Sequence, residues 1–112
     1  MKRLSLSETE RDALTLALAV LPLDYPVEDE EELDALKLFL DTLAAKLDEG
    51  RELFSRRELE LLYAAATSAS AFLSRRSGAP LPDEYADKLR PYVFAYIGIA
   101  SRLRSLPGQS KA

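Results

Sequence analysis

Cysteine and histidine are both absent from the 112 residues of this sequence. Without cysteine the chain has no disulfide, no thiolate zinc site and no cysteine nucleophile. Without histidine it lacks the commonest general base and the commonest nitrogen ligand for metals. We therefore expect that the protein is not an enzyme. We also expect a cytoplasmic location, because nothing in the sequence requires an oxidising compartment.

Phosphate-binding loops and long apolar runs are absent as well. The glycines Gly50, Gly78, Gly98 and Gly108 stand singly, so neither GxGxxG nor GxxxxGK[ST] occurs. The first residues contain no apolar segment of the kind found in signal peptides. The densest apolar run, residues 91–100, is half of the roughly 20 residues that a bilayer span requires. We expect no cofactor, no small-molecule substrate and no membrane insertion.

The sequence does contain the apolar periodicity of helices, over a length that suits one domain. The pattern predicts a single domain over residues 1–112, with a frayed tail at 107–112 and helices over about 8–21, 28–49, 56–76 and 83–106. The connections between them are short, which is typical of neighbouring antiparallel helices. We therefore predict an all-α fold, specifically an antiparallel up-down four-helix bundle.

Local signals define several helix ends. Ser7 with Glu10, and Ser55 with Glu58, have the spacing of capping boxes. Gly50 follows the second helix at the position where a left-handed residue closes a helix. The second helix also carries a single apolar stripe: Leu33, Leu36, Leu40, Leu43 and Leu47.

Pro91 lies inside the fourth helical segment, where proline removes a hydrogen bond and clashes with the preceding turn. The apolar spacing nevertheless continues across it, through Tyr85, Leu89, Tyr92, Tyr96, Ile99, Leu103 and Leu106. This spacing favours one helix kinked at Pro91. The alternative is a split segment, with a second helix that begins at the proline.

The third helix has small residues in the middle of its expected core stripe, which comprises Leu59, Leu62, Ala66, Ala69 and Leu73. We expect bulky residues such as Phe39 or Tyr96 to fill the space above the two alanines. The alternative is a groove that admits a partner helix or a small apolar ligand. A polar row is expected to face away from the core: Tyr63, Thr67, Ser70 and Ser74.

Acidic residues gather in the stretch EDEEELD, residues 28–34. Glu28, Glu31 and Glu32 would share a helical face, so a hard cation could use them. A matching carboxylate pair on the following helix is missing, however, and the helix dipole alone favours acidic residues in a first turn by about 0.3 to 1 kcal/mol each. A carboxylate-dependent metal-binding hydrolase is therefore an alternative function, and no residue is assigned as a metal ligand.

Charge is distributed unevenly along the chain. Residues 1–50 carry 13 acidic and 5 basic side chains, whereas residues 51–112 carry 6 acidic and 10 basic ones. Arg56 and Arg57 open a helix, where positive charge is unfavourable, so we expect acidic partners for them at the start of the second helix or in another chain. Arginine-mediated nucleic-acid binding is a second alternative, which the net charge of −4 disfavours.

Two large apolar side chains have no evident place in a bundle core. Leu38 projects from the far side of the second helix, and Phe94 projects beside Gly98 from the far side of the fourth. We predict an interaction surface at Leu38, Phe94, Gly98, Arg56 and Arg57. The function that we favour is a small helical protein that acts through protein–protein contacts, either as a homodimer or as a regulatory or adaptor module.

The Ser55 capping box gives the first testable prediction. The substitution Ser55→Ala should lower the free energy of unfolding by about 0.5 to 2 kcal/mol, because the first turn of the helix loses a hydrogen-bond acceptor. The fold should be retained. Urea denaturation followed by circular dichroism measures the change. An unchanged denaturation midpoint would mean that the helix begins elsewhere.

Overall fold

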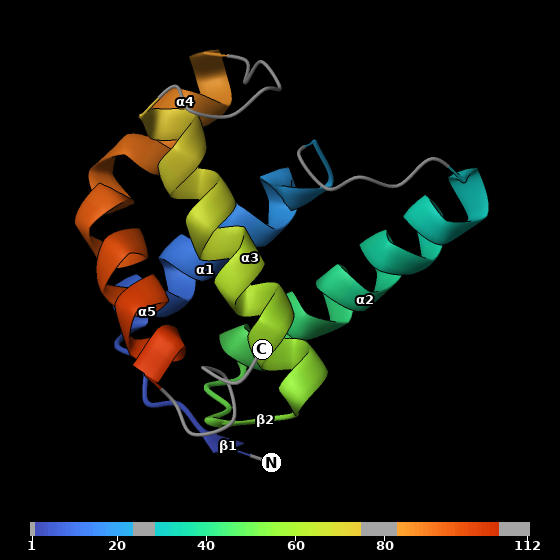
Figure 1. Ribbon diagram of the computed structural model, residues 1–112, viewed down its shortest axis with the longest axis horizontal. Helices are drawn as coiled ribbons and strands as arrows, with labels where there is room; N and C mark the ends of the chain where they lie inside the picture. Colours follow the sequence, from blue (N-terminus) through green and yellow to red (C-terminus); the bar gives the residue numbers. More distant parts are fainter. Residues whose placement is uncertain (1, 24–28, 75–82, 106–112) are drawn as a thin grey trace.

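The computed structural model describes residues 2–23, 29–74 and 83–105 and shows an all-α protein (Figure 1). Its helices are α1 (Glu8–Val20), α2 (Glu30–Asp48), α3 (Arg56–Leu73), α4 (Asp83–Leu89) and α5 (Val93–Ser105). The other described elements are two 3-10 turns, η1 (Leu21–Leu23) and η2 (Arg90–Tyr92), and two short strands, β1 (Lys2–Arg3) and β2 (Leu53–Phe54). The predicted fold class is confirmed, and the strand pair is an addition to it.

The predicted helices begin where the observed ones do, or within two residues of them. Asp29 caps α2, its carboxylate accepting from the amide of Glu31 at 2.9 Å. α3 ends at Leu73, earlier than predicted, and Ser74 is its C-cap. The predictions that concern residue 28, residues 75–82 and the tail 106–112 lie outside the described residues.

Both predicted capping boxes are present. The hydroxyl of Ser7 accepts from the amide of Glu10 at 3.1 Å, and the Glu10 carboxylate accepts from the amide of Ser7 at 2.9 Å. Ser55 and Glu58 make the same pair of bonds at the start of α3, at 3.1 Å and 2.7 Å. Gly50 has a φ of 80°, which confirms the left-handed residue predicted after α2.

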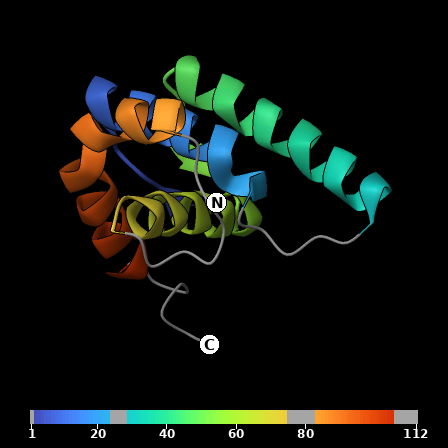
Figure 2. The same ribbon diagram turned by 90° about the horizontal axis from the view of Figure 1, so that it is seen from above.

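α1 is the central helix of the fold. It contacts each of the other four helices of the described chain, and it lies between α2 and α3 (Figure 2). Ala13, Leu14 and Ala17 on this helix are fully buried. The wide apolar face of α1 predicts contact from two directions, and the structure confirms it.

The antiparallel up-down bundle is not confirmed. α2 packs chiefly on α1, and its N-terminal end extends beyond the other helices in both views (Figures 1 and 2). The buried side chains of α2 form one narrow stripe: Leu36, Leu40, Leu43 and Leu47. One neighbouring helix is enough to bury a stripe of this width. α2 therefore has no second apolar face to pack against the second neighbour that each helix of an up-down bundle has.

The N-terminal segment is held against the far end of the chain. β1 pairs antiparallel with β2, and the amide of Leu4 donates to the carbonyl of Glu52 at 2.7 Å. The guanidinium of Arg102, on α5, donates to the carbonyl of Ser5 at 2.8 Å and forms an ion pair with Glu10. Leu4 and Leu6 are buried, so this segment covers one end of the core.

Pro91 divides the fourth helical segment, so the split of the second predicted alternative is present, although α5 begins at Val93 and not at the proline. It lies in η2, between α4 and α5, which run in different directions (Figures 1 and 2). The core stripe expected for a single kinked helix is therefore only partly buried: Tyr85 is 37% exposed and Tyr92 is half-buried. The members that are buried are Leu89, Tyr96, Ile99 and Leu103.

The small residues of α3 allow α5 to approach closely, and these two helices have the most extensive contact in the fold. Ala66 and Ala69 are fully buried, and so is Tyr96 of α5. The hydroxyl of Tyr96 donates to the carbonyl of Ala13 at 2.9 Å, which joins α5 to α1. The expectation for Phe39 is wrong, because that side chain lies on α2 and is 38% exposed.

An ion pair joins α2 to the start of α3. Lys46 donates to the carboxylate of Glu58, whose side chain is only 5% exposed. Burial by itself raises the pKa of Glu58, but the hydrogen bonds from Lys46 and from the Ser55 amide lower it by more. The pKa of Glu58 therefore lies below its ordinary value in the folded protein.

The packing of α3 predicts the effect of enlarging its small residues. Ala66→Leu or Ala69→Leu should each lower the free energy of unfolding by about 1 to 3 kcal/mol through overpacking. Thermal or urea denaturation measures the loss. Ala64→Leu is a control on the same helix at a half-buried position, where a smaller loss is expected. Two neutral core variants would contradict the close packing described here.

The Glu58 carboxylate predicts a pH dependence of stability. Because its pKa is lower in the folded than in the unfolded protein, ionised Glu58 stabilises the fold above the ordinary value of 4.5. That stabilisation is lost as the pH falls through the lower, folded-state pKa. In urea unfolding at a series of pH values, Glu58→Gln should therefore make stability fall less steeply below about pH 4.5.

Glu60→Gln is the matched control for this measurement, because Glu60 lies on the same helix with a side chain that is 47% exposed. This control should leave the acid slope close to that of the wild type. Equal slopes for Glu58→Gln and the wild type would show that Lys46 and Glu58 do not interact in solution.

Candidate functional site

The structure places Leu38 and Phe94 at the surface, as predicted. Phe94 is 84% exposed and Leu38 is 69% exposed. At Gly98, an added methyl group would meet no atom within 4 Å, so this glycine also borders open space. Ile97 of α5 is also exposed, at 53%. α5 therefore exposes two large apolar side chains, Phe94 and Ile97, three residues apart.

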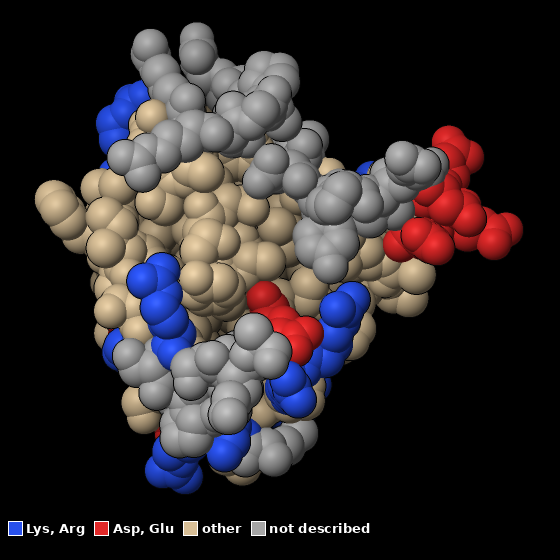
Figure 3. All heavy atoms as spheres, in the orientation of Figure 1, with Lys and Arg blue, Asp and Glu red and all other residues tan. Residues whose placement is uncertain are grey.

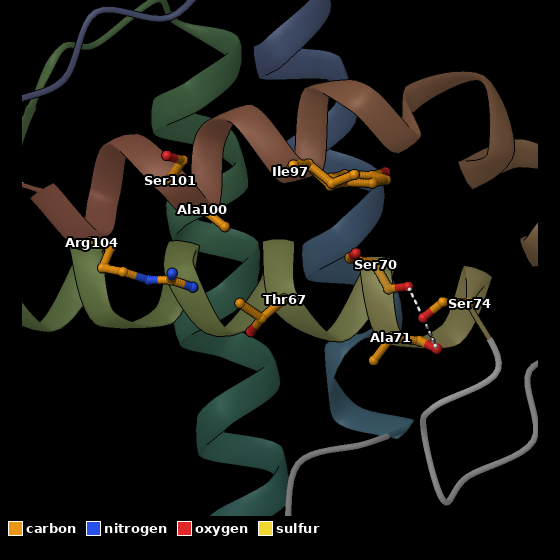
Figure 4. Close-up of a pocket in the computed structure, with 9 residues that line it drawn as sticks. Thr67, Ser70, Ala71, Ser74, Ile97, Ala100, Ser101 and Arg104 are labelled. Carbon is orange, nitrogen blue, oxygen red and sulfur yellow. Dashed lines mark hydrogen bonds between the residues drawn. The ribbon is translucent and has the colours of Figure 1, made fainter.

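A surface depression lies beside Ile97, between α3 and α5 (Figure 4), and we call it the α3/α5 hollow. Its volume is about 420 Å³. α3 contributes Thr67, Ser70, Ala71 and Ser74 to its walls. α5 contributes Tyr96, Ile97, Ala100, Ser101 and Arg104.

Hydroxyl groups line the α3 wall, but two of them are already bonded within the helix. The Thr67 hydroxyl donates to the carbonyls of Tyr63 and Ala64, at 2.9 Å and 3.0 Å. The Ser74 hydroxyl donates to the carbonyl of Ser70 at 2.9 Å, a bond drawn in Figure 4. Since these protons are occupied, this wall demands few hydrogen bonds from whatever contacts it. The sequence predicts only that the polar row of α3 faces away from the core. In the structure, Thr67, Ser70 and Ser74 of that row form one wall of the hollow.

The floor and one end of the hollow are chemically distinct. Tyr96 forms part of the floor, and burial, with a smaller effect of Tyr92, raises its pKa, so its phenol stays neutral. Arg104 closes one end, where its guanidinium donates to the Tyr63 hydroxyl at 3.4 Å. Arg104 is the one charged residue among the described residues that line the hollow, and no described carboxylate pairs with it.

Phe94 belongs to the same face of α5 as this wall. Phe94, Ile97, Ser101 and Arg104 follow one another at spacings of three, four and three residues, which places them along one side of the helix. In the space-filling view, the surface over α3 and α5 is largely uncharged, with basic side chains towards its lower end (Figure 3). The exposed apolar side chains Phe94 and Ile97 therefore lie on the same side of α5 as residues that line the hollow, whose one charged member among the described residues is Arg104.

The other predicted site residues lie away from this face. Leu38 is on α2, which is on the opposite side of the molecule from α5 in Figures 1 and 2. Arg56 pairs with Glu60 of its own helix at 3.4 Å, not with the acidic start of α2. Arg57 makes no ion pair within the described chain. The five predicted residues thus lie on three helices, with Phe94 and Gly98 on α5, Arg56 and Arg57 at the start of α3, and Leu38 on α2.

The acidic stretch at the start of α2 is spread along an exposed helical end (Figure 3). Asp29 is used as the helix cap, and Glu28 lies outside the described residues. Across residues 2–23, 29–74 and 83–105, no group of three or more acidic side chains is arranged to hold a metal ion. No observation therefore favours the hydrolase alternative.

Two further cavities are less suited to binding. One, of about 160 Å³, lies between α1 and α4 and is lined by Leu16, Ala19, Val20, Tyr85, Lys88 and Leu89. The other, of about 350 Å³, lies between α1 and α2 and includes Lys37 and Asp41 in its walls. The first is smaller than the roughly 300 Å³ of typical ligand sites, and the second has two charged side chains, Lys37 and Asp41, among its six lining residues.

Three residues that line the hollow, Ile97, Ala71 and Arg104, are not among the residues that the sequence assigns to an interaction surface or to the polar row of α3. The sequence does indicate the two residues on α5, because Ile97 and Arg104 follow Phe94 at helical spacing and so lie on the same side of the helix. On the α3 side the polar row was identified, but nothing in the sequence indicates that α5 passes beside it. The hollow depends on that tertiary arrangement.

Comparison with known proteins found no match to a family model, to a curated protein or to a solved structure. Among the helices of the described chain, none is long and apolar enough to cross a membrane.

Proposed function

We propose that this protein acts through protein–protein contacts made by the exposed face of α5, and that it forms a homodimer through that face. The observation that carries the proposal is that Phe94, 84% exposed, lies three residues from Ile97, which is 53% exposed and lines the α3/α5 hollow. Aromatic anchors of this kind supply much of the binding energy in protein interfaces. The absence of cysteine supports a cytoplasmic setting for this activity.

Two neighbouring apolar side chains, and not one, are exposed on this face of α5. Single exposed apolar residues are common at protein surfaces and need no explanation. Full burial of a Phe or Ile side chain contributes about 1.5 to 3 kcal/mol, so covering both Phe94 and Ile97 offers a substantial gain. Arg104 is the one charged side chain among the described residues that line the adjoining hollow, so few charges would have to be desolvated there. The face therefore favours contact with another apolar surface.

The alternatives from the sequence find less support. Arginine-mediated nucleic-acid binding needs a continuous basic surface, whereas Arg102 pairs with Glu10 and Arg56 pairs with Glu60. The metal-dependent alternative depends on the acidic start of α2, where no group of three or more described acidic side chains is arranged to hold a metal ion. We propose neither of them.

The substitution Phe94→Glu tests the proposed function. Sedimentation velocity at micromolar concentration should show a dimer for the wild type and a folded monomer for Phe94→Glu, because a charge replaces the anchor of the interface. Leu38→Glu is the matched control: Leu38 is also a large, exposed apolar residue on a helix, but it lies on α2. This control should remain dimeric.

Circular dichroism melts of both variants establish that they are folded. A wild-type chain that stays monomeric at high concentration would contradict the homodimer. A dimer that is lost in Leu38→Glu but kept in Phe94→Glu would move the interface to α2.

A further inference from the structure

The α3/α5 hollow has a charged end and an apolar end. Arg104 lies at the charged end, and its side chain runs from α5 towards Thr67 of α3 (Figure 4). Ile97 and Ala71 lie towards the other end, one on each helix. The volume of about 420 Å³ falls within the roughly 300 to 1,000 Å³ of small-molecule sites. A ligand that suits this hollow therefore combines an anionic group with an apolar body.

The length of the hollow follows from the two helices that form it. Ile97 and Arg104 are seven positions apart on α5, and Thr67 and Ser74 are seven positions apart on α3. At a rise of about 1.5 Å per residue, each wall is about 10 Å long. A carboxylate joined to one aromatic ring by a short alkyl chain matches this length.

The two arginines in the last turn of α5 have different surroundings. A helix C-terminus favours a cation by itself, so their presence alone indicates no ligand. Arg102 donates to the carbonyl of Ser5 and forms an ion pair with Glu10. Arg104 forms no ion pair with a described carboxylate, and it donates to the Tyr63 hydroxyl at a long 3.4 Å. Because a guanidinium has five N–H donors, Arg104 can bind a carboxylate in addition to Tyr63.

The carboxylate that precedes Tyr63 on α3 is already paired. Glu60 lies one turn before Tyr63, forms an ion pair with Arg56 at 3.4 Å and is not among the residues that line the hollow. On the floor, burial raises the pKa of Tyr96, so its phenol is neutral, and its hydroxyl donates to the carbonyl of Ala13. Among the described residues that line the hollow, no carboxylate therefore opposes an incoming anion.

The rest of the hollow suits an apolar body. Ala71 and Ala100 contribute methyl groups to the walls, and Ile97 is 53% exposed beside them. The Thr67 and Ser74 hydroxyls donate to carbonyls of their own helix. An apolar group that covers this part of the hollow therefore leaves neither of these two hydroxyl protons unsatisfied, and it removes apolar surface of Ile97 from water.

We propose that the α3/α5 hollow is a binding site for a small organic carboxylate, whose carboxylate group is held by Arg104 and whose apolar body lies between α3 and α5 over Tyr96. The ligand is bound and not converted. This inference goes beyond the proposed function and does not rest on it, because Phe94 is not among the residues that line the hollow.

Titration with hydrocinnamate, an aromatic ring joined to a carboxylate by two methylene groups, tests the site. Amide shifts of the ¹⁵N-labelled protein should change saturably along the facing walls of α3 and α5 and yield a dissociation constant. Hydrocinnamamide has the same shape without the charge, and it should bind at least about 10-fold more weakly, because the hydrogen bond to a charged group is lost. Arg104→Gln should lower the affinity for hydrocinnamate to that of the amide.

Two matched controls separate the site from general effects. Arg57→Gln removes the same charge from an arginine that lies on α3 and outside the lining, so it should leave the affinity for hydrocinnamate unchanged. Ala71→Leu fills the apolar end and should abolish binding of both probes. Ala64→Leu, on the same helix but outside the lining, should retain it. Circular dichroism establishes that each variant is folded.

Binding that needs both the Arg104 guanidinium and the space beside Ala71 supports the inference. The absence of a saturable shift with millimolar hydrocinnamate would overturn it. Equal weakening by Arg104→Gln and Arg57→Gln would also overturn it, since the probe would then respond only to overall charge. Binding that is retained in Ala71→Leu would place the probe outside the hollow, with the same consequence. The oligomeric state of the wild type tests the proposed function and has no bearing on these titrations.

Discussion

Burial of α1 is the interaction on which the other helices depend. Ala13, Leu14 and Ala17 are fully buried, and all four remaining helices contact this one element. α2 needs α1 because its single leucine stripe has no other extensive cover, and α5 is joined to α1 by the hydrogen bond from Tyr96 to Ala13. A helix that is contacted from several directions has few places for large polar groups, so the exposed face of α5 and the polar wall of α3 lie on the helices around α1.

The exposed face of α5 follows from this arrangement and from the small residues of α3. α5 turns Tyr96, Ile99 and Leu103 towards the core, and the helical period then places Phe94 on the outside. Ala66 and Ala69 let the two helices approach closely, and the small residues further round α3 leave the hollow beside the contact. The small side chains of α3 thus have two effects. They permit close packing on the side of α3 that faces the core, and they leave unfilled space on the neighbouring side.

Much of the local structure could be predicted from the sequence, because its causes are local. Capping boxes, the glycine after α2 and the leucine stripe act over a few residues, and each is where the spacing places it. The arrangement of helices could not be predicted in the same way. Short connections are compatible with several packings, and only the complete set of contacts selects one in which α2 has α1 as its main neighbour. Exposure of Phe94 was predictable from helical phase, whereas the hollow required knowledge of how α3 and α5 meet.

The bonds that fix α5 in place connect distant parts of the chain. The Tyr96 hydroxyl reaches back 83 residues to Ala13, and the Arg102 guanidinium reaches back 97 residues to Ser5. Contacts of such sequence separation are associated with slow folding, because the loop must close before they form. During synthesis, α1 and α2 can pair early, but the α3/α5 hollow cannot exist until α5 has left the ribosome. The proposed contact surface on α5 is therefore completed later than the α1–α2 pair, and chains that lack α5 do not present it.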